Sequence, residues 1–482
     1  MTLADLTPEQ WLKRLVAAHD EERKGLELMN AYYEGRQPLS YMAPELLNEL
    51  QDRMRQVVIN WPELIVDSLE ERLDIEGFRY ADSETTAEDL WQIWQANDLD
   101  EGSQQGHVDA LALGRAYAIV GTNDEDDDMP LVTVESALQV HAEQDPRTRR
   151  LLAAVKRWEE PCLGAAATKM ATLYLPNSRH VFALDKGAWA EQRDEGDEHG
   201  LGQLPVEMIA NRPRLAGPLG RSELKTVIPL SDAACKIATD MMLSAEYHAM
   251  PRRWATGASR DDFADEQGNP LGAFSSLAGR LWVNEDPNVK YGQFTEAQLT
   301  NFHETINALA RLVAALTGLP PHFLGLATAN PPSADAIRSS EARLVKRAER
   351  RQRAFGGAWE RVMRLALLVR DGEVAPSARS LETVWRDPST PTYAQKADAV
   401  VKLHSAGILP TEQAWEDLGY SAEQRRRMRE MQHSALERAM GGDLAAGYGP
   451  KPQPDLLPSG EDAAEPAPAT AGAVAAGPGR GE

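Results

Sequence analysis

Hydrophobic residues in roughly the first 115 positions recur at the spacing of α-helices. Thr7 and Pro8 supply a helix cap and a first-turn proline ahead of an apolar series that begins at Trp11. A second start at 60–62 leads into apolar positions on one face, and another helix is expected over 90–113. The pattern therefore predicts a helical N-terminal region.

The hydrophobic period changes to that of β-strands between residue 116 and about residue 212. Short apolar or alternating runs are separated here by turn residues, and they occupy 117–120, 131–134, 151–158, 170–175 and 181–184. This succession predicts an antiparallel meander. The acidic run 124–128 lies between two of these strands and lacks the glycine and downstream glutamate of a calcium loop. We interpret it as a solvated hairpin tip.

Helical spacing returns after residue 222, with a helix expected over 232–248. An irregular stretch follows over 251–292, and it contains a short strand at 281–283. The most regular pattern in the chain comes next, with apolar residues spaced 3, 4, 3, 4 and 3 apart: Leu299, Phe302, Ile306, Leu309, Val313 and Leu316. Such a narrow seam is typical of a helix that packs against a partner helix.

A second long helix is predicted after the glycine and prolines at 318–321, which end the first one. Ser333 caps this helix and Asp335 lies in its first turn, and the pattern continues to about Arg370. Two smaller helical segments are expected over 393–406 and 411–436. Residues beyond 441 are mostly Pro, Gly and Ala, a composition that predicts disorder. The fold class indicated is α+β with helices predominating.

Basic residues gather on this second long helix, although the chain as a whole is acidic. They include Arg338, Arg343, Lys346, Arg347, Arg350 and Arg351, with Arg353 close behind. One interpretation is a solvated face whose charges pair with acids such as Glu341 and Glu349. The other is a contact with an acidic neighbouring subunit or with a polyanion. The sequence leaves both open.

The length and net charge of the chain limit the classes of protein to which it can belong. The 482 residues suffice for about three modules, and the formal net charge is −23. A protein that binds DNA tightly has a basic surface. This chain therefore either does not contact nucleic acid or contacts DNA without binding it tightly. No apolar run reaches membrane-spanning length and the N-terminus lacks a signal peptide, so we expect synthesis in the cytoplasm and no membrane partner. Cys162 and Cys235 are interpreted as small buried residues.

Catalytic motifs are missing from the sequence. It contains no P-loop, no HExxH, no GxSxG and no set of kinase motifs. His303 and Glu304 resemble half of a zinc motif, but Asn307 occupies the position of the second histidine. We therefore predict no catalytic residues, no metal and no cofactor, and interpret the chain as a non-enzyme. An enzyme with an unrecognised site remains an alternative.

The order of these parts resembles the portal proteins of tailed double-stranded-DNA bacteriophages, specifically the SPP1-like type of siphophages. Five stretches carry the resemblance in detail: Asn60–Asp67, Val206–Pro213, Val227–Ala233, Thr317–Gly325 and Pro332–Arg338. The likeness extends over about residues 5 to 440. None of these stretches is a catalytic signature, so their number and order make the resemblance specific.

The resemblance implies a portal fold with wing, stem, clip and crown, assembled as a twelve-membered ring. The implied parts are a wing (1–221, a helical part and then the meander), a stem helix (222–250), a clip (251–292), a second stem helix (293–317), a tunnel loop (318–333), the long helix and the rest of the wing (334–390), a crown (391–440) and a disordered tail (441–482). The seam from Leu299 to Leu316 would pack stem helices together.

The implied function is passage of double-stranded DNA through one capsid vertex during packaging and ejection. The residues implied to face DNA in the tunnel loop are Leu324, Gly325, Leu326, Ala327, Thr328, Ala329, Asn330 and Pro331. The implied partners are further copies of the chain, the terminase large subunit, a head–tail connector, and the major capsid and scaffolding proteins. The protein would assemble in the host cytoplasm and reside in the virion. Another oligomeric head–tail connector and a helical scaffold protein are the alternative classes.

Overall fold

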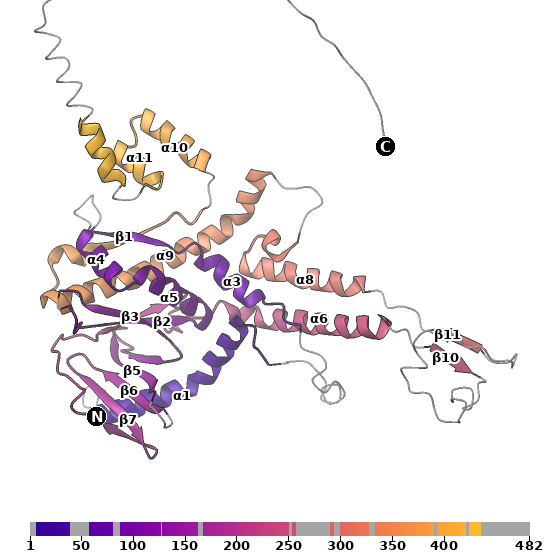
Figure 1. The fold of residues 1–482 in the computed structure, drawn as a ribbon, viewed down its shortest axis with the longest axis horizontal. Helices are drawn as coiled ribbons and strands as arrows, with labels where there is room; N and C mark the ends of the chain where they lie inside the picture. The colour runs from indigo at the N-terminus through magenta and orange to yellow at the C-terminus, as the bar shows by residue number, and fades with distance from the viewer. Residues whose placement is uncertain are drawn as a thin grey trace, which may run out of the picture. The chain divides into compact units, whose positions relative to one another are not determined.

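The computed structural model describes residues 6–38, 57–80, 87–126, 128–161, 167–249, 253–256, 290–293, 299–326, 333–389, 393–420 and 424–434. The chain divides into two compact units, residues 1–390 and 391–482. The first unit holds the helices and sheets that position the candidate site (Figure 1). The second contains α10 (Tyr393–Ser405), α11 (Thr411–Asp417) and a helical segment over 424–434. The sequence pattern had joined the last two into one segment.

Five elements precede the main sheets: α1 (Pro8–Tyr33), α3 (Trp61–Glu70), β1 (Ile75–Tyr80), α4 (Glu88–Ala96) and α5 (Leu99–Leu113). The predicted cap of α1 is confirmed, because the Thr7 side chain accepts a hydrogen bond from the Gln10 amide and Gln10 returns one to Thr7. The prediction of an all-helical region was wrong at β1, which pairs with β12 (Leu381–Trp385). Residues some three hundred positions apart make this pairing, so no local pattern indicates it.

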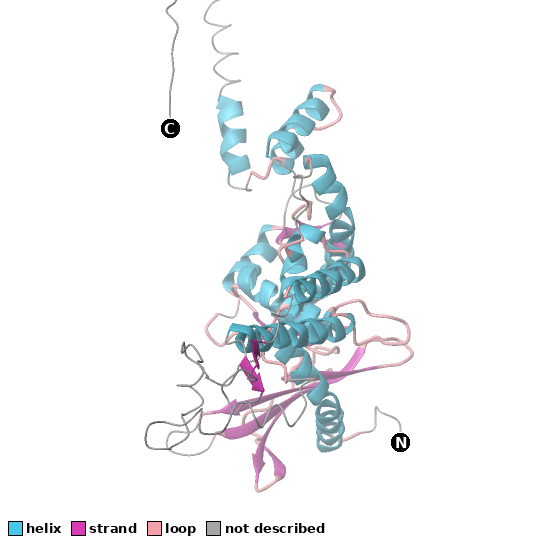
Figure 2. Cartoon of the chain, turned by 90° about the vertical axis from the view of Figure 1, so that its right-hand side faces the viewer, coloured by secondary structure: helices cyan, strands magenta, loops and turns pink. Residues whose placement is uncertain are grey.

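The five strands predicted between residues 116 and 212 all form, together with three more in that region, and every pairing is antiparallel. They build two sheets rather than one meander. The first contains β3 (Leu131–Ser136), β2 (Arg115–Gly121) and β9 (Val206–Ala210) in that order. The second contains β4 (Val140–Gln144), β5 (Leu151–Glu160), β6 (Thr168–Tyr174), β7 (Arg179–Asp185) and β8 (Ala188–Glu191). Figure 2 shows these strands gathered in one part of the first unit, with helices filling the rest.

The acidic run lies where the sequence placed it, in the connection between β2 and β3. Asp124, Glu125, Asp126 and Asp128 are exposed, as a solvated hairpin tip requires, and Asp127 lies outside the described residues. Cys235 is buried, as predicted, and Cys162 also lies outside the described residues.

The long helices after the sheets are η2 (Leu224–Thr226, one 3₁₀ turn), α6 (Ile228–Ala249), α8 (Thr300–Thr317), η4 (Pro321–Leu324, also 3₁₀) and α9 (Ala334–Asp371), followed by η5 (Pro376–Ser380) before β12. The predicted cap of α9 is confirmed, since the Ser333 side chain accepts a hydrogen bond from the Ala336 amide at 3.2 Å. Between α6 and α8, β10 (Arg253–Thr256) pairs with β11 (Lys290–Gln293). The strand predicted at 281–283 lies outside the described residues.

Two hydrophobic cores hold the first unit together. Residues of α1, among them Trp11 and Leu15, pack on the five-stranded sheet against Val155 and Phe182. The larger core lies where α9 crosses α5 and the three-stranded sheet. These contacts fix α9 on a rigid base, and the basic residues of the sequence analysis project from this helix.

The centre of the larger core is aromatic and contains one histidine. The Trp359 indole donates a hydrogen bond to His107 Nε2 at 2.9 Å, and Phe355 stacks on the same imidazole with ring centroids 5.0 Å apart. His107 is completely buried, and this burial lowers its pKa from 6.5 to about 3. The ring therefore stays neutral in the folded protein across the ordinary pH range.

Acid is expected to destabilise the fold through His107. Below pH 6.5 the unfolded chain protonates His107, whereas the folded chain does not protonate it until about pH 3. The free energy of unfolding therefore falls as the pH drops through this window. The loss between pH 7 and pH 4.5 is about 2.5 kcal/mol. His107→Gln keeps an acceptor for Trp359 without ionising, so urea unfolding at pH 7 and 4.5 should show a smaller loss for it. His303→Gln, at an exposed site on α8, is the matched control. Equal losses in all three proteins would contradict this account.

Candidate functional site

Helices α6 and α8 lie against each other along their lengths (Figure 1). The apolar seam predicted on α8 only partly faces this contact. Val313 is buried, and Ile306 and Leu309 are half-buried against the larger core. Leu299 and Phe302 are half-buried as well, whereas Leu316 is 56% exposed. The last position of the seam therefore lies outside the contact between the two helices.

A second apolar stripe lies beside this seam on α8. It consists of Ala308, Leu312, Ala315 and Leu316, which share one side of the helix at spacings of 4, 3 and 1 and are all exposed. Leu312 is 52% exposed, and Met242 on α6 is 50% exposed. Large apolar side chains on neighbouring helices are thus left uncovered within the described part of the chain. An exposed apolar surface of this kind marks an interaction site.

Only the first part of the predicted tunnel loop falls within the described residues. Leu324 ends η4, Gly325 adopts a left-handed conformation with φ of 71°, and Leu326 follows. Ala327, Thr328, Ala329, Asn330 and Pro331 lie outside them. At the end of α8, Gly318 is also left-handed, and a Cβ there would meet the Arg343 side chain at 2.8 Å. Glycine at this position therefore lets α9 approach the end of α8 closely.

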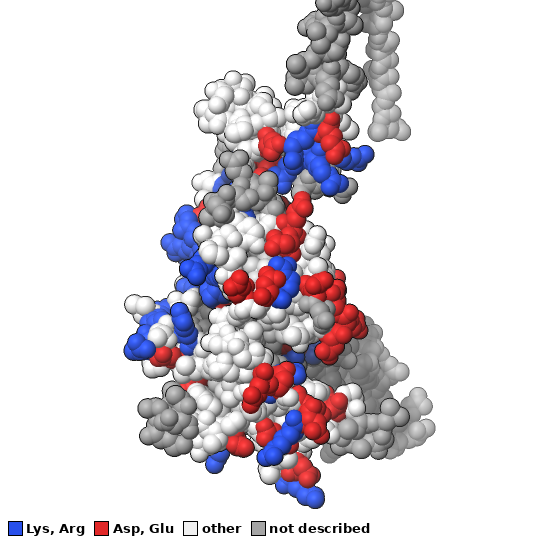
Figure 3. Space-filling model, turned by 90° about the vertical axis from the view of Figure 1, so that its left-hand side faces the viewer, with Lys and Arg blue, Asp and Glu red and all other residues white. Residues whose placement is uncertain are grey.

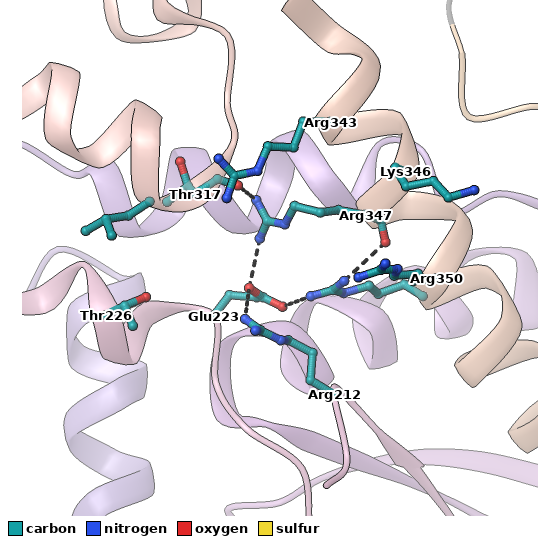
Figure 4. Close-up of a pocket in the computed structure, with 10 residues that line it drawn as sticks. Arg212, Glu223, Thr226, Thr317, Arg343, Lys346, Arg347 and Arg350 are labelled. Carbon is teal, nitrogen blue, oxygen red and sulfur yellow. Dashed lines mark hydrogen bonds and ion pairs between the residues drawn. The ribbon is translucent and has the colours of Figure 1, made fainter.

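Most of the basic residues predicted on α9 line one pocket of about 370 Å³ (Figure 4). It is lined by Arg212, Glu223, Thr226, Leu316, Thr317, Arg343, Lys346, Arg347, Arg350 and Arg351. Arg338 is exposed nearer the start of α9 and does not line it. The pocket lies between the end of α8, the segment from β9 to α6, and the middle of α9.

The buried carboxylate of Glu223 organises this pocket. Glu223 Oε2 accepts from Arg347 at 2.8 Å and lies 3.4 Å from Arg212 Nη1, and Oε1 accepts from Arg351. Figure 4 shows Glu223 between Arg347 and Arg212. Burial by itself would raise the pKa of Glu223, but the guanidinium groups of Arg351 and Arg347 outweigh it and hold the pKa below its usual value. Glu223 is therefore ionised and ties α9 to the segment before α6.

Two arginines also bind the C-terminal end of α8. Arg343 Nη1 donates to the Ala315 carbonyl at 2.7 Å, and Arg347 Nη1 donates to the Thr317 carbonyl. These carbonyls lack partners within their own helix, and the helix dipole adds negative potential there. The two cations thus fix the end of α8 against α9.

The structure divides the basic residues between the two interpretations that the sequence left open. Lys346 pairs with Glu349 on the surface at 2.5 Å, as a solvated face predicts. Glu341 lies 3.8 Å from Arg72 and 3.9 Å from His322. Arg350 is exposed, and no carboxylate of the described residues forms an ion pair with it. The cluster is therefore partly structural and partly open to another anion.

Glu223 and Arg212 are the residues of this site that sequence reasoning missed. Arg212 lies in one of the stretches that carry the family resemblance, which was a usable signal. Glu223 is one of 74 acidic residues, and only its burial among arginines distinguishes it.

Charge is unevenly distributed on the surface as well. On the face seen in Figure 3, a group of basic side chains lies along one edge, and acidic and basic side chains are neighbours elsewhere. Within the described ranges, no group of three or more His, Cys, Asp or Glu side chains is placed to hold a metal ion. None of the helices in those ranges has the length and apolar character needed to span a membrane.

Comparison with known proteins gives matches over most of the chain. The family described as phage portal protein, SPP1 Gp6-like, matches residues 12–438. The portal protein of Mycobacterium phage D29 is 38% identical over 437 residues, which cover 89% of this chain and 88% of the relative. The portal protein of Mycobacterium phage L5 is 35% identical over 474 residues, covering 94% and 96% respectively.

Proposed function

This chain belongs to the SPP1 Gp6-like family of phage portal proteins, and we propose that its copies form a closed ring at one capsid vertex. Its function is that of a phage portal protein, a structural component of the virion. Double-stranded DNA would pass through the centre of the ring during packaging and ejection.

The observation that carries the ring is the uncovered apolar stripe on α8. Leu312 and Leu316 are more than half exposed although α8 already packs on α6. A cyclic ring uses contacts in which one surface of a subunit meets a different surface of the next. The alanines at 308 and 315 leave little bulk between the leucines, so a neighbouring helix can approach closely. The stripe therefore suits contact with the next copy.

The parts of the portal fold are assigned within this proposal. Helices α6 and α8 would form the stem, and the segment between them, whose ends pair as β10 and β11, would be the clip. Residues 318–333 would be the tunnel loop and 391–440 the crown. The wing would comprise α1, α3, α4, α5 and α9 with the three-stranded and five-stranded sheets and the β1–β12 pair. The ring would contain twelve subunits. Its proposed partners are the terminase large subunit, the head–tail connector, and the major capsid and scaffolding proteins.

The mass of the purified protein tests the ring directly. Native mass spectrometry and negative-stain images are expected to give a ring of about twelve copies of the 53.1 kDa chain. A monomer or dimer at every concentration would refute the proposal.

Removing the tip of the tunnel loop tests whether the loop acts in DNA packaging rather than in ring assembly. Deletion of 326–330 is expected to leave rings of normal mass, because Arg343 and Arg347 bind the end of α8 to α9. DNA packaging by particles that carry the deletion should fall, since a loop between two rigid helices is suited to contact moving DNA. Normal packaging in an assay of protected DNA would count against this role.

A further inference from the structure

The pocket on α9 holds more positive charge than the fold uses. Six cationic side chains line it against one carboxylate, that of Glu223. Arg347 and Arg351 are committed to Glu223, Arg212 lies 3.4 Å from the same carboxylate, and Arg343 binds the end of α8. Lys346 has Glu349 at the surface, but Arg350 forms no ion pair with any carboxylate among the residues described. A surplus of positive charge therefore remains at the mouth of the pocket.

Gathering these cations is unfavourable without a counter-charge. Burial lowers the pKa of Arg347, and Arg351 and Arg212 lower it further, against the opposing effect of Glu223. Arginine stays charged in proteins, so the repulsion is relieved by an anion rather than by loss of a proton. The exposed ends of Arg350 and Lys346 leave this mouth accessible.

We propose that the pocket binds a phosphate group, held by Arg350 and Lys346 at the mouth and supported by the Arg347 and Arg212 guanidinium groups that line the same pocket. A phosphate offers several acceptor oxygens and more charge than a carboxylate, and the planar guanidinium of arginine matches it in two-point contact. The Thr226 side chain also lines the pocket. The surplus of several cations thus fits a phosphate better than a single carboxylate.

The phosphate group could come from either of two sources: free inorganic phosphate or the backbone of DNA. The ten lining residues come from a single copy of the chain, so phosphate binding is tested on isolated protomers as well as on rings. Only the choice of DNA as its source rests on the proposed function. One accessible pair of cations per subunit would make a weak, salt-sensitive contact that lets DNA move.

The test pairs one double variant with a matched control on the same helix. Lys346→Ala with Arg350→Ala removes the mouth of the pocket and leaves the Glu223 ion pairs in place. Arg353→Ala removes an exposed charge from α9 that does not line the pocket. Each protein is titrated with inorganic phosphate at constant ionic strength, with chloride as the reference, while its melting temperature is followed. Saturable stabilisation reports binding to the folded state.

Wild type and Arg353→Ala should be stabilised by phosphate beyond chloride, and the double variant should need at least roughly tenfold more phosphate. Equal responses of all three proteins, or equal effects of phosphate and chloride, would overturn the site. In the second arm, a fluorescent duplex of about 20 base pairs is titrated in the same buffers. Weaker duplex binding by the double variant, with a salt slope lower by about two, identifies the DNA backbone. Unchanged duplex binding beside a lost phosphate response identifies free phosphate.

A carboxylate from the neighbouring subunit is the competing occupant. In that case phosphate would act on isolated protomers but not on rings, and that result would refute the proposal. Measuring the mass of every sample separates failure of the ring from failure of the pocket.

Discussion

Replacing Leu312 and Leu316 with aspartate is expected to give folded protomers that do not assemble. Both side chains are more than half exposed in the protomer, so the change should cost little folding stability. In the ring each leucine would contribute about 1.5–3 kcal/mol of burial, and each aspartate would place a charge in this apolar contact. The penalty recurs at every subunit contact. Sedimentation velocity should show a single species near 53.1 kDa, with an unchanged far-ultraviolet circular dichroism spectrum.

Leu215→Asp is the control for the chemical change itself. Leu215 is 85% exposed and lies in the segment between β9 and η2, outside the apolar stripe of α8. This variant should assemble like the wild type. Rings of normal mass from the Leu312→Asp, Leu316→Asp double variant would exclude this stripe as the contact.

Replacing Glu223 with alanine is expected to destabilise the first unit by about 3–5 kcal/mol. The change leaves Arg351 and Arg347 buried without the carboxylate that neutralises them. Because Arg347 also binds the carbonyl of Thr317, the end of α8 should loosen as well. The free energy of unfolding measured in urea should therefore fall, and ring formation should weaken with it, since Leu316 lines the same pocket.

Two further variants distinguish the effect of losing a buried carboxylate from the effect of losing any carboxylate. Glu349→Ala removes the surface partner of Lys346 and should change the free energy of unfolding by less than about 0.5 kcal/mol. Combining Glu223→Leu with Arg351→Met replaces one buried ion pair by apolar groups, so its cost should be smaller than that of Glu223→Ala. A Glu223→Ala protein as stable as Glu349→Ala would contradict the role assigned to Glu223.

The two predictions concern neighbouring parts of one helix. The C-terminal end of α8 carries both the last residues of the apolar stripe and the carbonyls that Arg343 and Arg347 bind. Position and orientation of the stripe thus depend on the Glu223 cluster. A change in the pocket should reach the proposed ring contact through this shared helix end.

Local features of this protein followed from the sequence alone. Thr7 and Ser333 cap their helices as predicted, because capping involves residues only three positions apart. The strand runs between 116 and 212 were found because alternation is also a short-range pattern. The family was indicated by several stretches in order, although none of them is a catalytic motif.

Contacts between distant residues were decided by the tertiary structure. Strand β1 was hidden in a helical region because its partner, β12, begins at Leu381. The basic residues of α9 were visible in the sequence, but Arg351 meets Glu223 across 128 positions. The buried carboxylate of Glu223 determines which of these cations stabilise the fold through ion pairs and which are left to bind another anion. Sequence spacing determines which side chains share a helix face, whereas burial and partner choice depend on the packing of whole elements.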